Sequence, residues 1–222
     1  MRILQFPTEF SVGKLLIGEK YDGTDWNEAI EAQGTIEVPE NKYVSFWLGA
    51  RLSVTTDLYF LKPIKPNDFD EFLAASSWFS DKDIEKILYL SGLDSLQIWE
   101  TEITDETLKK LSNFKKLRVL GIDSTQVTDD GLCYLSEITS LERLSVYSTE
   151  INGSCFPQLT KLNLKQLDIG WTNVGDDSIQ FLKQMKSLKY LRIIDTKITE
   201  SGFLELEENL PDCRIYFHKS NK

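Results

Sequence analysis

From Leu93 to Leu210 the apolar residues of this chain return with a period of about 24 residues. Five successive segments share the pattern L-x-x-L-x-[IV]-x-x-T-x-[IV]. Within each copy the apolar positions first alternate, as one face of a strand requires, and then recur at steps of three, as a helix requires. The pattern therefore predicts five units, each a short strand, a turn and a short helix. They open at Leu93, Leu117, Leu141, Leu164 and Leu188.

The same positions carry the same residue types in every copy. Position nine is threonine throughout, at Thr101, Thr125, Thr149, Thr172 and Thr196. A unit of this size cannot bury its apolar face alone, so neighbouring units must stack around one continuous core. The sequence therefore predicts a solenoid.

The repeat resembles the leucine-rich repeat, and in particular its bacterial variety with T-x-[IV]-T-D-x-x-L after the strand. The matching segments are Thr101–Asp105 with Leu108, and Thr125–Asp129 with Leu132. The usual signature has Asn or Cys at position nine, where this chain has Thr. We expect the threonine hydroxyl to satisfy backbone groups where the strand ends. The resemblance implies an α/β solenoid, a curved parallel sheet with helices on its convex side.

Both ends of the repeat array are predicted from the same pattern. Residues 69–92 read as a degenerate copy, in which Phe79–Asp81 stands where Ile103–Asp105 stands in the next one. After Pro211, residues 213–218 read as a closing strand, which brings the expected total to seven strands. The repeat domain is thus predicted to span 67–218, with a degenerate repeat at 69–92, five repeats from 93 to 212 and the closing strand 213–218.

Residues 1–66 have a different character, with short β-rich runs at Arg2–Phe6, Val12–Ile17, Thr35–Val38 and Tyr43–Leu48. The loop from Val38 to Tyr43 predicts a hairpin between the last two runs. Asp22–Trp26 reads as a loop, and Trp26–Ala32 as one or two helical turns. Pro63 and Pro66 mark a boundary. Because the first repeat would otherwise expose its core, we predict that 1–66 is a small β-rich cap domain packed on it.

Charge and hydropathy narrow the expected partners and location. With 35 acidic and 25 basic residues the formal net charge is −10, which argues against nucleic acid and favours solubility or a basic partner. No run of 18 apolar residues predicts a membrane span, and the first residues lack a long apolar segment. We expect a cytoplasmic monomer without a membrane partner, unless a targeting signal has been removed.

Candidate chemistry is sparse. Cys133, Cys155 and Cys213 cannot all pair, and we expect buried free thiols. No Cys/His cluster, phosphate loop or nucleophile motif is present, so we expect no metal, no cofactor and no enzymatic activity. Aspartates recur at position thirteen of four copies, and we expect them to cap the following helices rather than to bind a metal. They are Asp81, Asp105, Asp129 and Asp176.

Function is expected on the concave face, toward which positions three, five and seven of each strand point. Aromatic residues and arginines are prominent there, and both types are enriched at the centres of protein interfaces. We expect Arg143, Arg192 and Arg214 to line up across strands. We also expect Trp99, Tyr147 and Trp171 to form a second, aromatic line along the strand ends. The candidate partner-binding residues are Trp99, Asp123, Arg143, Tyr147, Asp168, Trp171, Tyr190, Arg192, Arg214 and Tyr216.

The preferred function is a non-catalytic module that binds a protein or peptide partner on this face. One alternative is a substrate-recruiting subunit similar to F-box leucine-rich repeat proteins, which the β-rich N-terminus disfavours. Another is a small-ligand binder or enzyme at the junction of cap and repeats, near Trp26, Trp47 and Trp78. A further alternative is a solvated sheet whose aromatic side chains pack only on one another.

Overall fold

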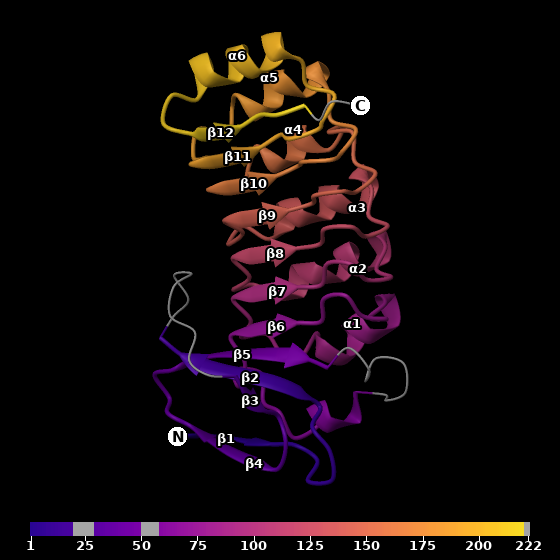
Figure 1. Cartoon of the computed structure of the whole chain (residues 1–222), viewed down its shortest axis with the longest axis vertical. Coiled ribbons are helices and arrows are strands. Elements are labelled where there is room, and N and C mark those ends of the chain that lie inside the picture. The colour runs from indigo at the N-terminus through magenta and orange to yellow at the C-terminus, as the bar shows by residue number, and fades with distance from the viewer. Residues whose placement is uncertain (20–28, 50–57, 220–222) are drawn as a thin grey trace.

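The computed structural model describes residues 1–19, 29–49 and 58–219 and shows an elongated stack of strands and helices (Figure 1). In this part of the chain one ten-stranded sheet has the order β12-β11-β10-β9-β8-β7-β6-β5-β2-β3. The strands from β5 to β12 run parallel in sequential order. The repeat strands are β6 (Glu71–Leu73), β7 (Ser95–Gln97), β8 (Val119–Gly121), β9 (Arg143–Ser145), β10 (Gln166–Asp168), β11 (Tyr190–Arg192) and β12 (Arg214–Tyr216). Their number and spacing confirm the predicted solenoid.

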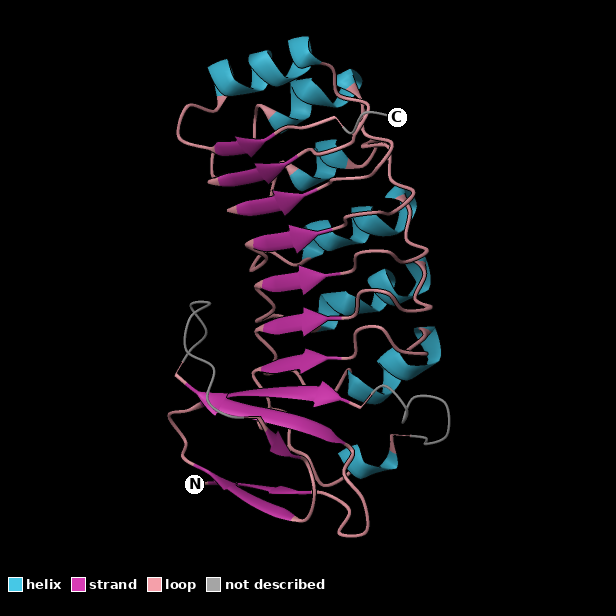
Figure 2. Ribbon diagram, in the orientation of Figure 1, coloured by secondary structure: helices cyan, strands magenta, loops and turns pink. Residues whose placement is uncertain are grey.

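A helical segment follows each strand from β6 to β11, and these segments cover one side of the sheet (Figure 2). The α-helices are α1 (Asp81–Ile87), α2 (Asp105–Lys110), α3 (Asp129–Leu132), α4 (Phe156–Leu159), α5 (Ile179–Leu182) and α6 (Glu200–Asn209). The 3₁₀ turns are η1 (Tyr59–Leu61), η2 (Leu111–Asn113), η3 (Cys133–Glu137) and η4 (Asp176–Ser178). No helix of the described residues is both long and apolar enough to span a membrane.

The core follows the repeat. The position-four leucines are at most 2% exposed and face the helices, and adjacent copies align residue for residue, as Leu96 does with Leu120. The threonine of position nine is buried in every copy. Its hydroxyl donates to the carbonyl of position six at 2.6–3.0 Å. This confirms the expectation that threonine satisfies the backbone where the strand ends.

Position eight of each copy turns the chain sharply through a left-handed backbone conformation, with φ between +50° and +56°. This conformation is unfavourable for residues with a side chain, and glycine is the usual choice. None of the six residues here is glycine: they are Ser76, Glu100, Ser124, Ser148, Trp171 and Asp195. The adjacent threonine hydrogen bond holds the turn, so the repeat tolerates this local strain.

The aspartates of position thirteen connect neighbouring repeats. Asp105 accepts from the backbone N–H of Thr128, at 2.8 Å, and from its hydroxyl, at 2.7 Å. Thr128, not Asp105, caps α3 by accepting from the Asp130 N–H. Asp81 and Asp176 bind the next repeat in the same way, while Asp129 accepts from three backbone N–H groups of the following repeat. The expectation that these aspartates cap the helices that follow them was therefore wrong: Thr104, for example, caps α2, and Asp105 instead holds the start of the next copy.

The N-terminal strands are β1 (Arg2–Gln5), β2 (Gly13–Gly18), β3 (Ile30–Glu31), β4 (Thr35–Val38) and β5 (Tyr43–Leu48). Strand β5 pairs in parallel with β6, and β2 and β3 extend the same sheet. Phe46 of β5 stacks on Phe69 with 4.9 Å between ring centroids. The strands that close the solenoid therefore share both its sheet and its core. We retain the division into 1–66 and 67–218 as a proposal.

Two local expectations for the N-terminal part were wrong. The predicted hairpin does not form, because β4 pairs with β1 in a separate two-stranded sheet while β5 pairs with β2 and β6. Residues 39–42 form the turn between these sheets. Of the predicted helical turns at 26–32, the described residues Ile30 and Glu31 form strand β3, since they complete the edge of β2. The predicted loop at 22–26 lies outside the described residues.

Candidate functional site

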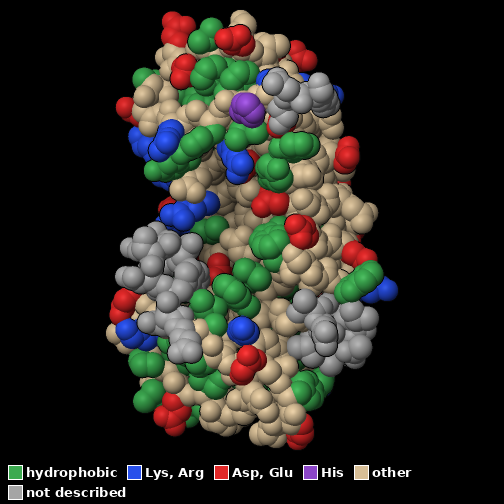
Figure 3. Space-filling view, in the orientation of Figure 1, with side chains coloured by type: hydrophobic (Ala, Val, Ile, Leu, Met, Phe, Trp, Pro, Cys, Tyr) green, Lys and Arg blue, Asp and Glu red, His purple; other side chains and the backbone are tan. Residues whose placement is uncertain are grey.

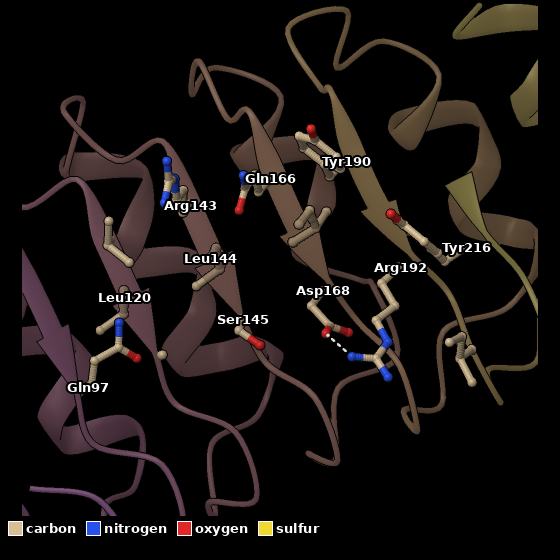
Figure 4. A pocket seen from close by; sticks show the side chains of 14 residues that line it. Gln97, Leu120, Arg143, Leu144, Ser145, Gln166, Asp168, Tyr190, Arg192 and Tyr216 are labelled. Atoms are coloured by element: carbon tan, nitrogen blue, oxygen red, sulfur yellow. Dashed lines mark hydrogen bonds and ion pairs between the residues drawn. The ribbon is translucent and has the colours of Figure 1, made fainter. Parts of the chain in front are cut away.

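The concave face, the side of β6 to β12 that is turned away from the helices, contains a hollow of about 600 Å³. Residues from β7 to β12 line it (Figure 4). Half of the predicted binding residues meet there: Arg143, Asp168, Tyr190, Arg192 and Tyr216. Space-filling shows charged and hydrophobic side chains around this side of the stack (Figure 3). We call this site the concave hollow.

Small residues on successive strands create the space. Gly121 and Ser145 occupy position five of β8 and β9, and Gly170 occupies position seven after β10. A Cβ on Gly121 would lie 2.1 Å from the amide oxygen of Gln97, and one on Gly170 would lie 3.0 Å from the ring of Tyr147. The side chains of Gln97 and Tyr147 therefore lie over these glycines, and of the two glycines Gly121 lines the hollow.

Arg192 joins two strands at one end of the hollow. Its Nη1 lies 3.4 Å from Oδ2 of Asp168, and its guanidinium carbon lies 5.5 Å from the ring centroid of Tyr147. Asp168 also accepts from the Gly170 N–H. Burial raises the pKa of the Asp168 carboxyl, although this N–H and the Arg192 charge oppose the shift. Arg192, Asp168 and Tyr147 are thus held largely by one another.

Asp123 is similarly occupied by the fold. Its Oδ1 accepts from the hydroxyl of Ser145 and from the N–H of Tyr147, the latter at 2.7 Å. Burial raises the pKa of the Asp123 carboxyl despite these hydrogen bonds, and the nearby charge of Asp168 raises it further. Asp123 therefore fixes the end of β9, a contact that the sequence did not predict.

The three candidate arginines do not form the single line that we expected. Parallel register aligns Arg143 with Gln166, then Tyr190, then Arg214, all at position three. Arg192 lies in the neighbouring row, opposite Tyr216. Figure 4 shows Arg143, Gln166 and Tyr190 side by side on successive strands. The reason for the error is that strand residues two apart share a face but belong to different rows.

The predicted aromatic line is also interrupted. Trp99 and Tyr147 both occupy position seven, but Asp123 stands between them in register and Gly170 follows. Trp171 is 53% exposed and lies at the strand-end edge. There it lines a separate depression of about 310 Å³ together with Ser148, Thr149, Glu150, Thr172, Asn173, Asp195, Thr196 and Lys197. The left-handed backbone of Trp171 separates it from the concave hollow.

Several residues at the hollow were not among the sequence candidates. Gln97, Ser145, Gln166 and Ile194 line it as well. They stand at positions three, five and seven, which we expected on this face, but the selection of aromatic and charged residues left them out. The lysines of position two, immediately before β10 and β11, were also missed. They are Lys165 and Lys189.

At the junction of cap and repeats the polar groups around Glu71 are satisfied by one another. Glu71 is 9% exposed and accepts from the hydroxyls of Ser45, at 2.5 Å, and Ser95, at 2.7 Å. The indole N–H of Trp47 donates to Ser45. Trp78 is 60% exposed, and Trp26 lies outside the described residues. A polar depression of about 480 Å³ does lie between cap and repeats, with Arg2, Tyr43 and Asp94 in its lining, and it favours the small-ligand alternative. Neither Trp47 nor Trp78 lines it.

The cysteines lie away from the concave hollow: Cys133 and Cys155 belong to the helical segments, and Cys213 directly precedes β12. Cys133, Cys155 and Cys213 are free thiols, of which only Cys155 is fully buried. Burial, together with the neighbouring thiol of Cys133, raises the pKa of Cys155. A metal-binding cluster of three or more His, Cys, Asp or Glu side chains is not found within the described ranges.

Comparisons with known proteins identify the fold. No family model and no curated protein matches the chain. The crystal structure of an internalin (inlF) from Listeria monocytogenes is similar, with 23% identity and a TM-score of 0.58, over 70% of this chain and 43% of the internalin. An internalin C2 (inlC2) structure from the same species has 21% identity and a TM-score of 0.47, and the match covers 70% of this chain and 75% of the internalin C2 chain. The chain thus spans less than half of the first internalin.

Together with the register of the sheet, this similarity establishes a leucine-rich-repeat solenoid with an N-terminal cap.

Proposed function

We propose that this chain is a non-catalytic interaction module that binds one protein or peptide partner in the concave hollow. The observation that carries the proposal is an open space of about 600 Å³ on the sheet face, bordered in part by side chains outside the core. Arg143 is exposed, and Tyr190 is 46% and Tyr216 37% exposed. Large aromatic and arginine side chains around a concave surface are typical of binding sites.

The size of the face limits the form of the partner. Seven strands spaced about 4.8 Å apart, each offering roughly 10–13 Å of strand, project to about 300–400 Å². A standard interface uses about 800 Å² on each partner. A globular partner would therefore also have to contact the strand-end edge near Trp171 or the cap, whereas a peptide or a protruding loop fits the hollow alone.

The test uses a double variant, Arg143→Ala with Tyr190→Ala, as bait for affinity capture from native lysate. The matched control is Lys109→Ala with Tyr134→Ala, a cation and a tyrosine 5.9 Å apart on the helical side. All four side chains are at least partly exposed, so we expect both variants to keep the wild-type circular dichroism spectrum and melting temperature.

The captured partner is then measured against each variant by calorimetry. We expect the concave variant to lose about tenfold or more in affinity, since truncated hot-spot residues typically cost about 2 kcal/mol or more. The control is expected to bind as the wild type does. Equal capture by all three proteins would refute the proposal.

The adaptor alternative is weaker, because the described residues of the N-terminal part, 1–19 and 29–49, form strands and turns rather than a helical recruitment motif. We retain the bacterial repeat type and a cytoplasmic location as predictions.

A further inference from the structure

The edge of the sheet where β9 to β12 begin is basic, although the chain as a whole has a formal net charge of −10. Arg143 and Arg214 stand at position three of β9 and β12, and Lys165 and Lys189 immediately precede β10 and β11. Neighbouring strands lie about 4.8 Å apart, so four cations on four consecutive strands fall within about 15 Å. Basic side chains gather at this margin of the stack (Figure 3). We call these four residues the basic edge.

The charges of position two show why this edge is unusual. From Asp94 on, position two alternates in sign, and Arg118 pairs with Glu142 at 2.5 Å and with Asp94 at 3.6 Å. The alternation continues through Lys165 and stops at Lys189, so that two lysines precede adjacent strands. Like charges on adjacent strands destabilise a sheet. Lys165 and Lys189 therefore repel each other across the two strands, and an external anion would reduce this repulsion.

The chain itself neutralises these cations only in part. The Arg118 hydrogen bond lowers the pKa of the Glu142 carboxyl at this edge, and the charges of Lys165 and Arg143 lower it further. Lys189 is 3.9 Å from Asp212, an exposed and weak pair, and Lys165 bonds only the amide oxygen of Asn163. Arg214 lies over the ring of Tyr216, at 4.9 Å. Arg143 has no carboxylate within ion-pair distance among residues 1–19, 29–49 and 58–219. The contrast is Arg192, whose charge faces Asp168.

Next to the basic edge, the concave hollow offers aromatic and aliphatic surface. Tyr190 stands directly between Gln166 and Arg214 in register, and Ile194 and Tyr216 lie further along the same hollow. A ligand that occupies both features needs carboxylates on one side and at least one apolar side chain on the other. Nucleic acid fits less well, because Asp168 and Asp123 lie close to the same surface and few phosphates could be reached.

We propose that the partner presents an acidic segment containing an aromatic residue, which crosses β9 to β12 with its carboxylates on the basic edge and its ring in the hollow. This inference rests on the proposed function and specifies the chemistry of the partner. It differs from the expectation of a basic partner, which was based on the net charge of the whole chain. The ligand would contact the basic edge, where the local charge is positive.

The probes are soluble polymers of defined chemistry: a random glutamate–tyrosine copolymer, polyglutamate, a lysine–tyrosine copolymer and a single-stranded oligonucleotide. Binding to the full chain is measured by fluorescence anisotropy at low salt. The test variant is Arg143→Glu with Lys189→Glu. The control, Lys82→Glu with Lys109→Glu, makes the same change in net charge on α1 and α2, on the helical side.

We expect the glutamate–tyrosine copolymer to bind most tightly, and the test variant to lose about tenfold or more while the control stays within about twofold. Raising the salt from about 50 mM to about 300 mM should weaken the binding. Absence of binding by the wild type, tighter binding of the lysine–tyrosine copolymer or of the oligonucleotide, or equal loss in the control would each overturn the inference.

Failure of this inference can be told apart from failure of the proposed function. A captured partner that still binds the Arg143→Glu, Lys189→Glu protein but not the Arg143→Ala, Tyr190→Ala protein would refute the acidic segment alone. A partner that binds both would refute the concave hollow as the binding site, and with it this inference.

Discussion

Replacement of Asp105 by alanine tests how the repeats are held together. The carboxylate of Asp105 accepts two hydrogen bonds from Thr128 of the next repeat, at 2.7 and 2.8 Å. Thr128 in turn caps α3. The substitution removes both hydrogen bonds and leaves the Thr128 N–H to water, without changing the apolar core.

The expected loss follows from these contacts. A hydrogen bond to a charged group contributes about 1.5–3 kcal/mol. Because Asp105 is half-buried and water can partly replace it, we take the lower end and expect a loss of about 2–3 kcal/mol for the pair. Asp105→Asn should lose less, since its amide can still accept from the Thr128 N–H and donate to the Thr128 hydroxyl.

The control is Asp130→Ala, because Asp130 is exposed in the first turn of α3. It contributes mainly through the helix dipole, which amounts to about 0.3–1 kcal/mol. Urea unfolding followed by circular dichroism gives the difference in free energy of unfolding. Hydrogen exchange should show faster exchange at the start of α3, because coupling in a solenoid is between neighbours. A loss for Asp105→Ala no larger than that for Asp130→Ala would refute the reasoning.

A second substitution checks the packing that accompanies this link. A Cβ on Gly131 would lie 2.2 Å from Oδ1 of Asp105 and 2.8 Å from its Cα. Gly131→Ala should therefore destabilise the wild type strongly and the Asp105→Ala protein less, since one of the two clashes is gone. Additive losses would show that the two residues do not act on each other.

Three further predictions concern single positions. Burial raises the pKa of Asp123, so its ionisation opposes folding once the pH exceeds the ordinary carboxyl range. In urea unfolding, Asp123→Asn should therefore be more stable than wild type at about pH 7 and no more stable at about pH 3. A gain in stability that does not depend on pH would contradict this. Thr125→Val leaves the Ile122 carbonyl without its donor and should lower the free energy of unfolding by about 1–3 kcal/mol, while Thr125→Ser stays close to wild type. Ser148 has φ +56°, so Ser148→Val should lower the melting temperature clearly and Ser148→Gly should not; equal effects would mean that strain is unimportant there.

Much of the fold could be predicted because the same pattern of buried and exposed positions recurs in every repeat. Each copy must bury its leucines against the next, and in a parallel stack this permits one register, in which Leu96 aligns with Leu120. The role of the position-nine threonine followed from the same repetition. For the binding face, alternation along the strand was sufficient to place Arg143, Tyr190 and Tyr216 around one hollow.

The tertiary structure alone decided whatever depends on how separate segments meet. Strands β4 and β5 are adjacent in sequence but belong to different sheets, because each pairs with a distant partner. Asp105 reaches the next repeat instead of its own helix, and Asp123 is held by the hydrogen bonds of β9. Arg192 is neutralised by Asp168, whereas Arg143 has no carboxylate within ion-pair distance in the described chain. Periodicity in a sequence determines which side chains are buried, but only the distances between strands determine which charges neutralise each other.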